Sequence, residues 1–227
     1  MSDATVPIAA YVDFVSPFSW LAVARLRDIE ARSRLRFQLK PILLAVLLDH
    51  HGLVAAGEVK AKRDHELRRI AWRASELGLD FEVPPRHPFV SLRSLRTAAL
   101  YQGGDQMLSV CRELFAACWE RGEDLTRGSV VESVLIGLGI DTSGLEDWVG
   151  SSTAKELVKA NTAEALEAGA FGVPSFVTPD GLVFWGQDQL DRLEQWAMDE
   201  LPEPSPALER AMAMSVAQGR VRAPRND

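Results

Sequence analysis

Segments with the apolar and polar pattern of strands and segments with the pattern of helices follow one another along the chain. Residues 7–15 are mostly apolar, which is typical of a strand buried on both faces. After Ser16-Pro17, apolar residues recur at helical spacing as far as residue 29, and residues 35–39 then alternate as a second strand. This order predicts a strand–helix–strand unit with a right-handed crossover.

In the middle of the chain, the spacing of apolar residues predicts helices. Residues 42–48 are continuously apolar and predict a buried helix, and residues 58–78 predict a basic helix that ends at Gly78. Further helices are predicted over residues 91–102, 105–121, 126–138 and 153–168. The large aromatic residues at helical positions are expected in the core: Trp72, Phe89, Trp119 and Trp148.

Strands return near the end of the chain, at 175–178 and 182–185, and Pro179-Asp180-Gly181 between them predicts a hairpin turn. A last helix is expected over 187–198, and helical structure again over 207–218. The predicted fold class is α/β, with one domain built from both ends of the chain and an all-helical insertion. We place the α/β domain at 1–44 and 160–200, the insertion at 45–159 and a tail at 201–227.

Composition narrows the class of protein. The chain has 227 residues and a net charge of −7, which argues against nucleic acid as a partner. It contains no apolar run of 18 residues and does not open with a secretory pattern, so we expect neither a membrane span nor export. Cys111 and Cys118 are seven helical positions apart, roughly 10 Å, which is too far for a disulfide. We therefore expect a reducing, cytoplasmic location.

The first candidate for chemistry is Ser16-Pro17-Phe18-Ser19, at the junction of strand and helix. A serine and a proline here are explained by helix capping alone. However, a helix N-terminus with unpaired N–H groups is also a good place to hold a thiolate. Cysteines in place of Ser16 and Ser19 would form a Cys-x-x-Cys motif. Both are serines in this chain, so thiol–disulfide exchange is excluded at this position.

The second candidate is Phe171-Gly172-Val173-Pro174-Ser175, just before the third strand. It can be a plain helix-to-strand connection. The alternative is a cis peptide bond at Val173–Pro174 that brings the Val173 backbone within about 6 Å of Ser16. The four histidines, 50, 51, 65 and 87, show no metal-ligand spacing, so no metal site is expected.

Together with Phe184-Trp185-Gly186-Gln187-Asp188, these two motifs resemble one family in order and spacing, from about residue 7 to residue 198. The chain is similar to 2-hydroxychromene-2-carboxylate isomerases and kappa-class glutathione transferases. The resemblance implies a thioredoxin fold with a helical insertion, glutathione as cofactor, a small aromatic substrate and a homodimer.

The resemblance also implies roles for individual residues. Ser16 would donate a hydrogen bond to the glutathione thiolate, and Pro17 and Phe18 would continue the contact. The Val173 backbone, next to Pro174, would pair with the cysteinyl backbone of glutathione. The remaining implied contacts are Gln187 and Asp188 at the γ-glutamyl end and Lys62 at the glycine carboxylate.

Three positions depart from the family pattern. Gln187 stands where transferases have serine and isomerases often have asparagine. His65 and Arg69 stand where the pattern has tyrosine and aspartate, so contacts to substrate near them are open.

The energetic demand on Ser16 is moderate. Lowering the pKa of a thiol by about two units from 8.5 requires roughly 2.7 kcal/mol. A hydroxyl bonded to an anion supplies about 1.5–3 kcal/mol and a helix dipole about 0.3–1 kcal/mol, which together suffice.

Three functions remain open. The first is a glutathione-dependent isomerase that interconverts an aromatic hemiketal and its conjugated α-keto acid by reversible thiolate addition. The second is a kappa-like glutathione transferase, which Trp20 favours because isomerases more often have tyrosine there. The third is a thioredoxin-fold module that binds thiols or peptides without turnover.

Overall fold

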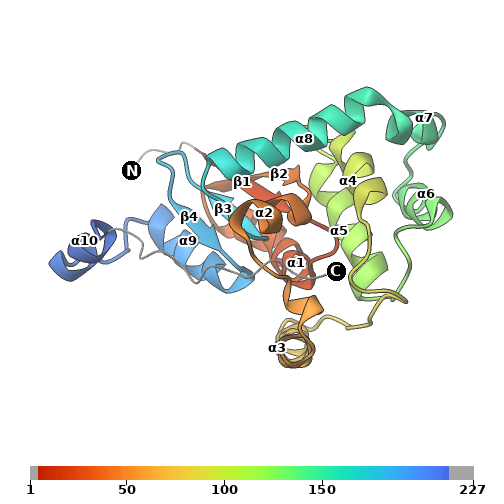
Figure 1. Ribbon diagram of the computed structural model, residues 1–227. Helices are drawn as coiled ribbons and strands as arrows, with labels where there is room; N and C mark the ends of the chain where they lie inside the picture. The colour runs from red at the N-terminus through yellow and green to blue at the C-terminus, as the bar shows by residue number, and fades with distance from the viewer. Residues whose placement is uncertain (1–4, 215–227) are drawn as a thin grey trace.

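The computed structural model describes residues 5–214 (Figure 1). Its helices and strands are β1 (Val6–Val12), α1 (Pro17–Arg32), β2 (Leu35–Pro41), α2 (Leu44–His51), η1 (Ala56–Glu58), α3 (Lys60–Glu76), α4 (Leu92–Ala99), α5 (Met107–Trp119), α6 (Gly128–Gly137), α7 (Leu145–Gly150), α8 (Ser152–Glu167), β3 (Ser175–Val177), β4 (Val183–Trp185), η2 (Gln187–Gln189), α9 (Leu190–Ala197) and α10 (Pro206–Met212).

The four strands form one mixed sheet in the order β2-β1-β3-β4. β1 and β2 run parallel, with Val6 opposite Leu35, and α1 connects them. β3 pairs antiparallel with β1, with Tyr11 opposite Ser175, and β4 closes the predicted hairpin against β3. The strands thus come from both ends of the chain with the helices inserted between them, which confirms the predicted α/β class.

Side chains of β1 alternate between two apolar clusters, one on each face of the sheet. Ile8, Ala10 and Val12 pack in the larger cluster, which also holds the buried residues of α1, α5 and α9. Tyr11 belongs to the smaller cluster, with Ala165 of α8. Figure 1 shows the same layers, with α8 along one side of the sheet and α1 and α9 on the other. β1 is therefore buried on both faces, as its apolar sequence predicts.

The inserted helices share the larger cluster with α1. Trp20 of α1 is fully buried and stacks on Phe81 at a ring distance of 5.9 Å, and its Nε1 donates to Glu120 at 2.9 Å. On α5, Cys111 and Cys118 are buried and unpaired, which confirms the expectation for the two cysteines. The segment boundaries proposed from the sequence remain a prediction.

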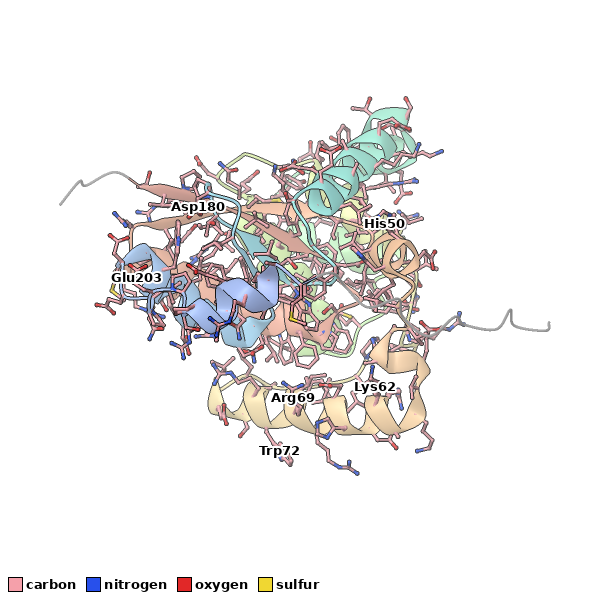
Figure 2. All side chains as sticks on the ribbon, turned by 60° about the vertical axis from the view of Figure 1, so that its left-hand side comes forward. His50, Lys62, Arg69, Trp72, Asp180 and Glu203 are labelled. Carbon is pink, nitrogen blue, oxygen red and sulfur yellow. The ribbon has the colours of Figure 1, made fainter. Side chains whose placement is uncertain are left out.

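Four details differ from the sequence-based expectations. The apolar run 42–48 does not form a buried helix: α2 buries only Leu47, and Val46 is 41% exposed. The sequence pattern does not predict α7, because this helix has only six residues. Trp72 is expected in the core but is 64% exposed on the outer side of α3 (Figure 2). The helix predicted at 207–218 is shorter than expected, because α10 ends at Met212; the expected part beyond Met214 lies outside the described residues. No helix within residues 5–214 has the length and apolar character to cross a membrane.

Candidate functional site

Ser16 lies at the junction where β1 leads into α1. Its backbone N–H donates to the Asp13 carbonyl at 3.0 Å, and its hydroxyl oxygen accepts the N–H of Ser19 at 3.3 Å. Pro17 occupies the first turn of α1, so the predicted cap is confirmed. The Ser16 hydroxyl lies 3.5 Å from the Val173 carbonyl oxygen, at the outer limit for a hydrogen bond. The oxygen therefore caps the helix while its proton is only weakly engaged.

The Val173–Pro174 peptide bond is cis, as predicted, and this turn faces Ser16. The Pro174 carbonyl accepts the N–H of Gly186 at 2.9 Å, which joins the turn to the start of η2. Gly172 is required by close packing, because a Cβ there would lie 2.7 Å from Nε1 of Trp185. Residues from both ends of the chain thus meet at one site.

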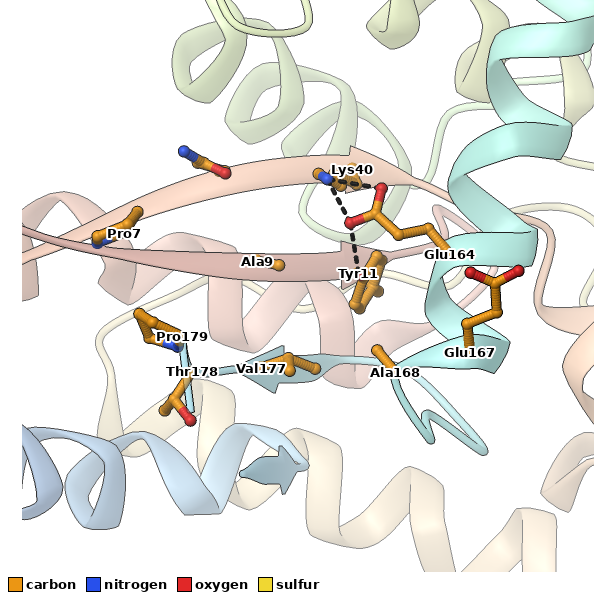
Figure 3. Close-up of a pocket in the computed structure, with 11 residues that line it drawn as sticks. Pro7, Ala9, Tyr11, Lys40, Glu164, Glu167, Ala168, Val177, Thr178 and Pro179 are labelled. Atoms are coloured by element: carbon orange, nitrogen blue, oxygen red, sulfur yellow. Dashed lines mark hydrogen bonds and ion pairs between the residues drawn. The ribbon is translucent and has the colours of Figure 1, made fainter. Parts of the chain in front are cut away.

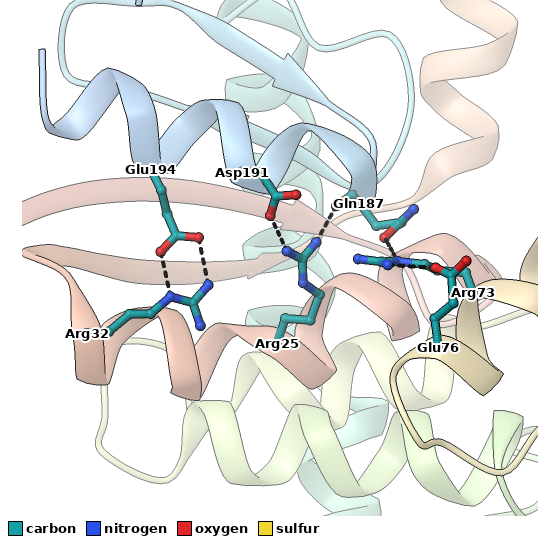
Figure 4. A network of polar contacts seen from close by, with 7 residues as sticks. All are labelled: Arg25, Arg32, Arg73, Glu76, Gln187, Asp191 and Glu194. Carbon is teal, nitrogen blue, oxygen red and sulfur yellow. Dashed lines mark hydrogen bonds and ion pairs between the residues drawn. The ribbon is translucent and has the colours of Figure 1, made fainter. Parts of the chain in front are cut away.

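Gln187 and Asp188, both in η2, differ in what they can offer a ligand. The Gln187 side chain is buried, and its Oε1 accepts from Nε of Arg73 on α3 at 3.2 Å (Figure 4). The Gln187 carbonyl accepts from Arg25 at 2.9 Å. Asp188 is exposed and forms no ion pair with any residue in 5–214. Asp188 can therefore receive a ligand cation, whereas the side-chain oxygen of Gln187 is already engaged.

Helix α3 lies beside the N-terminus of α1 and carries the predicted Lys62. Lys62 is exposed, and no residue of the described range forms a hydrogen bond or ion pair with its ammonium (Figure 2). Two turns along α3, the Arg69 guanidinium lies over the Phe18 ring, 5.6 Å from its centroid. Phe18 is half-buried at the start of α1. Arg69 therefore lies against the site at Phe18, and a ligand contact by Lys62 stays a prediction.

Asp13 is a buried carboxylate beside Ser16 that the sequence analysis did not single out. Its Oδ1 accepts from the Val15 N–H at 3.1 Å and its Oδ2 from the Leu44 N–H at 2.9 Å. Burial raises the pKa of Asp13, although hydrogen bonds from Ser91 and Leu44 act in the lowering direction. Asp13 thus caps α2 and fixes the loop before Ser16. The available signal was a charged residue in an otherwise apolar strand.

A shallow groove of about 480 Å³ lies on the other face of the sheet, along the N-terminal half of β1 (Figure 3). At its end, Lys40 contacts both carboxylate oxygens of Glu164 at 2.5 and 2.7 Å, and Tyr11 donates to Glu164 at 2.9 Å. These groups neutralise one another. Within residues 5–214, no cluster of three His, Cys, Asp or Glu side chains could hold a metal ion.

The fold and this site define a thioredoxin-fold protein in which two serines occupy the positions of the redox cysteines. The family described as DSBA-like thioredoxin domain matches residues 7–196. The chain belongs to this family and, within it, to the group formed by 2-hydroxychromene-2-carboxylate isomerases and kappa-class glutathione transferases.

Three relatives illustrate this assignment. A 2-hydroxychromene-2-carboxylate isomerase from Pseudomonas sp. (strain C18) is 31% identical over 188 residues, covering 81% of this chain and 86% of its own. Glutathione S-transferase kappa 1 from Rattus norvegicus is 24% identical, with coverage of 86% and 95%. The solved structure of a 2-hydroxychromene-2-carboxylate isomerase has a TM-score of 0.79 and 27% identity, and covers 92% of this chain and 100% of its own.

Proposed function

We propose that this protein is a glutathione-dependent isomerase that interconverts an aromatic hemiketal and its conjugated α-keto acid. The observation that carries the proposal is that the Ser16 hydroxyl oxygen accepts one hydrogen bond while its O–H has no strong acceptor. Its oxygen accepts from Ser19 at 3.3 Å, while its proton has only a 3.5 Å contact with Val173. That proton is free to donate to an anion at the N-terminus of α1.

The residues around Ser16 fit the parts of glutathione. Val173 presents a backbone carbonyl next to the Ser16 hydroxyl, which suits pairing with the cysteinyl N–H. The exposed Asp188 carboxylate suits the γ-glutamyl ammonium, and Gly186 ties that segment to Pro174. Pro17 and Phe18 form the adjoining wall, and Lys62 is the proposed partner of the glycine carboxylate. Arg73 engages the Gln187 oxygen, and the amide N–H₂ of Gln187 is available to a ligand.

When bound, glutathione supplies a thiolate that adds reversibly to the conjugated double bond of the substrate. The role of Ser16 is to keep the sulfur ionised by donating a hydrogen bond from its hydroxyl group. Because Oγ already accepts the Ser19 N–H, the hydroxyl is polarised towards donation. The N-terminus of α1 adds its dipole at the same point.

Arg69 supports a substrate that carries a carboxylate. Its guanidinium lies over Phe18, and its side chain is 46% exposed. Glu66 accepts one of its N–H groups at 2.8 Å, and the remaining guanidinium donors can bind an acid group. An aromatic α-keto acid offers both a ring for Phe18 and a carboxylate for Arg69.

A kappa-like glutathione transferase is the second candidate, because the chain is similar to proteins of that name. Trp20, which favours this candidate through the family resemblance, is fully buried, and its Nε1 donates to Glu120. A module that binds thiols or peptides without turnover is the third candidate.

One experiment separates the three. The protein is mixed with glutathione and 2-hydroxychromene-2-carboxylate, the substrate class of the named relatives, and products are followed by absorbance and mass spectrometry. The isomerase converts substrate while free glutathione stays constant, and the transferase consumes glutathione into an adduct. Calorimetry that detects no glutathione binding would leave only the third candidate. Ser16→Ala is the matched control, and it should lose most of the turnover near neutral pH.

Two broader proposals accompany this function. A cytoplasmic location is supported by the two unpaired, buried cysteines. A homodimer is proposed from the family alone, and analytical ultracentrifugation tests it.

A further inference from the structure

The two carbonyl groups that precede Ser16 each receive a hydrogen bond from the inserted helical segment. Trp119 Nε1, at the end of α5, donates to the Phe14 carbonyl at 3.0 Å. His87 Nε2 lies 3.1 Å from the Val15 carbonyl oxygen. Phe14 and Val15 directly precede Ser16. Both contacts therefore act on the backbone next to Ser16, the proposed hydrogen-bond donor to the thiolate.

The contact with Val15 determines the proton position on the His87 ring. A carbonyl oxygen can only accept, so Nε2 carries the proton and Nδ1 carries the lone pair. Nδ1 is buried and has no hydrogen-bond partner within the described chain. Burial lowers the pKa of His87; the hydrogen bond to Val15 acts in the raising direction, and the positive charge of Arg63 lowers the pKa. The neutral Nε2–H imidazole is therefore the form present near pH 7.

Packing fixes the plane of the ring. His87 and Trp119 meet edge to face, with ring centroids 5.2 Å apart and an interplanar angle of 76°. On another side lies Gly57 of η1, where a Cβ would come within 3.4 Å of His87 Cε1. The two donor rings therefore pack against each other, and each directs its N–H at the strand–helix junction.

Asp13 also stabilises this junction, because it accepts two backbone hydrogen bonds there. Its carboxylate accepts a hydrogen bond from the Val15 N–H at 3.1 Å, and its carbonyl accepts one from the Ser16 N–H at 3.0 Å. The polar backbone groups from the Phe14 carbonyl to the Ser16 N–H are thus all engaged. Groups that orient a catalytic side chain must themselves be held in place, and here the ring pair supplies that support from a different segment of the chain.

We propose that His87, packed against Trp119, is a positioning residue that fixes Ser16 so that its hydroxyl donates a hydrogen bond to the bound thiolate. This rests on the proposed glutathione function. The unpartnered Nδ1 follows from the same arrangement, because the ring must present Nε2 to Val15.

The first test titrates the thiolate absorbance at 240 nm of glutathione bound to the wild type, His87→Phe, His87→Asn and His87→Gln. Glutamine can place an amide N–H near the position of Nε2, whereas asparagine is too short and phenylalanine has no donor. We expect His87→Phe and His87→Asn to raise the thiolate pKa by about 0.5–1 unit, because roughly half of the Ser16 contribution is lost. His87→Gln should stay near the wild type, as should His65→Phe, the control at an exposed histidine of α3.

The outcomes separate the two proposals. A wild type that lowers the thiolate pKa, with His87→Phe equal to it, overturns the role of His87 and leaves the proposed function intact. If His87→Gln raises the pKa as much as His87→Phe, ring packing rather than the donated hydrogen bond is responsible, and the proposal is wrong. A wild type that does not bind glutathione overturns the proposed function, and the second test then decides about His87.

The second test uses no glutathione. In a Ser16→Cys background, the pKa of the introduced thiol, measured from the pH dependence of alkylation by iodoacetamide, reports the environment of position 16. Adding His87→Phe should raise that pKa by about 0.5–1 unit, and adding His65→Phe should not change it. In the unaltered protein, ¹⁵N chemical shifts of His87 should show the Nε2–H tautomer at pH 7. The Nδ1–H tautomer, a charged ring or an unchanged pKa of the introduced thiol would overturn the proposal, and the chemical shifts decide it even if His87→Phe does not fold.

Discussion

The Ser16 hydroxyl oxygen accepts the backbone N–H of Ser19 across 3.3 Å. These are the two positions that would hold the cysteines of a redox motif, and here they form a helix cap. Ser19 itself is fully buried, and its hydroxyl has no partner among the described residues. Capping and thiolate stabilisation therefore do not exclude one another. The cap uses a lone pair of the oxygen, and the thiolate would accept the hydrogen bond of the O–H group.

Substitutions of Ser16 can separate these two roles. Ser16→Ala removes both, and we expect a loss of about 0.5–2 kcal/mol in unfolding free energy and a rise of about 1–2 units in the pKa of bound glutathione. Ser16→Asp keeps the cap, but its negative charge repels a thiolate. The Ser19 N–H keeps its acceptor in this variant, while the thiolate pKa rises further. Urea denaturation and titration at 240 nm measure the two effects.

Ser151 offers the matched control, because its hydroxyl caps α8 by accepting the Ala154 N–H at 3.1 Å. Ser151→Ala should cost a similar amount of stability without altering the thiolate pKa. If Ser16→Ala and Ser151→Ala give the same thiolate titration curve, Ser16 is a cap alone.

Asp188→Asn should weaken glutathione binding by about ten-fold, the loss of one charge-assisted hydrogen bond. Asp188 is exposed, forms no ion pair within residues 5–214 and accepts a hydrogen bond only from the adjacent Gln189 side chain at 3.2 Å, so stability should hardly change. Asp191→Asn is the control: Asp191 is also exposed but is paired with Arg25. Calorimetry with glutathione, and with an analogue that lacks the γ-glutamyl amino group, checks the assignment. The analogue should bind the wild type and Asp188→Asn equally weakly, and a further ten-fold loss in Asp188→Asn with the analogue would contradict the assignment.

The native thiols should be unreactive. Burial raises the pKa of Cys111, and burial together with Asp124 raises that of Cys118, so almost no thiolate forms at neutral pH. A colorimetric disulfide reagent should label neither cysteine until the protein unfolds, and no insulin reduction should occur. Dithiol oxidation that persists in Cys111→Ser/Cys118→Ser would contradict the redox inertness of the Ser16 site.

Acid should destabilise the protein through His87. Its folded-state pKa lies below the ordinary 6.5 because of burial, so as pH falls through 6.5 the unfolded chain binds a proton that the native state does not. The stabilisation is present above pH 6.5 and is lost as pH falls towards the folded-state pKa. The unfolding free energy of His87→Gln should fall less steeply between pH 7 and 5 than that of the wild type. His65→Gln, at an exposed position, should keep the wild-type slope.

Arg69→Met should raise KM for a carboxylated aromatic substrate by about ten-fold, because one charged hydrogen bond is lost. KM for an uncharged electrophile should stay the same. Arg68→Met changes a neighbouring basic side chain on α3 and serves as the control. Equal effects of both substitutions would mean that α3 acts through its general charge.

Local signals explain what the sequence could predict. The Ser16-Pro17 cap and the hairpin at Pro179–Gly181 depend on residues close together in the chain, and both form as expected. The cis bond before Pro174 came from the family resemblance, since the dipeptide itself carries almost no such information.

Features that depend on distant partners escaped prediction. Arg73 reaches Gln187, 114 positions away, and His87 reaches Val15, 72 positions away, and neither pair has a local signature. Burial of the run 42–48 is a wrong prediction, because an apolar run does not reveal whether a second layer covers it. Trp72 is misplaced for the same reason: its spacing on α3 is helical, but within the described chain no other element packs over that face.

The sheet order has a consequence for how the protein is made. Tyr11 of β1 pairs with Ser175 of β3, so 164 positions separate partners on adjacent strands. At ribosomal speeds this separation corresponds to roughly ten to thirty seconds, during which β1 and β2 are complete but one edge of β1 has no partner. A nascent chain that holds Ser16 but not yet Asp188 can offer glutathione only part of its contacts. Ligand binding should therefore begin abruptly once the segment from β3 to η2 has been made, and truncation before β3 should abolish it.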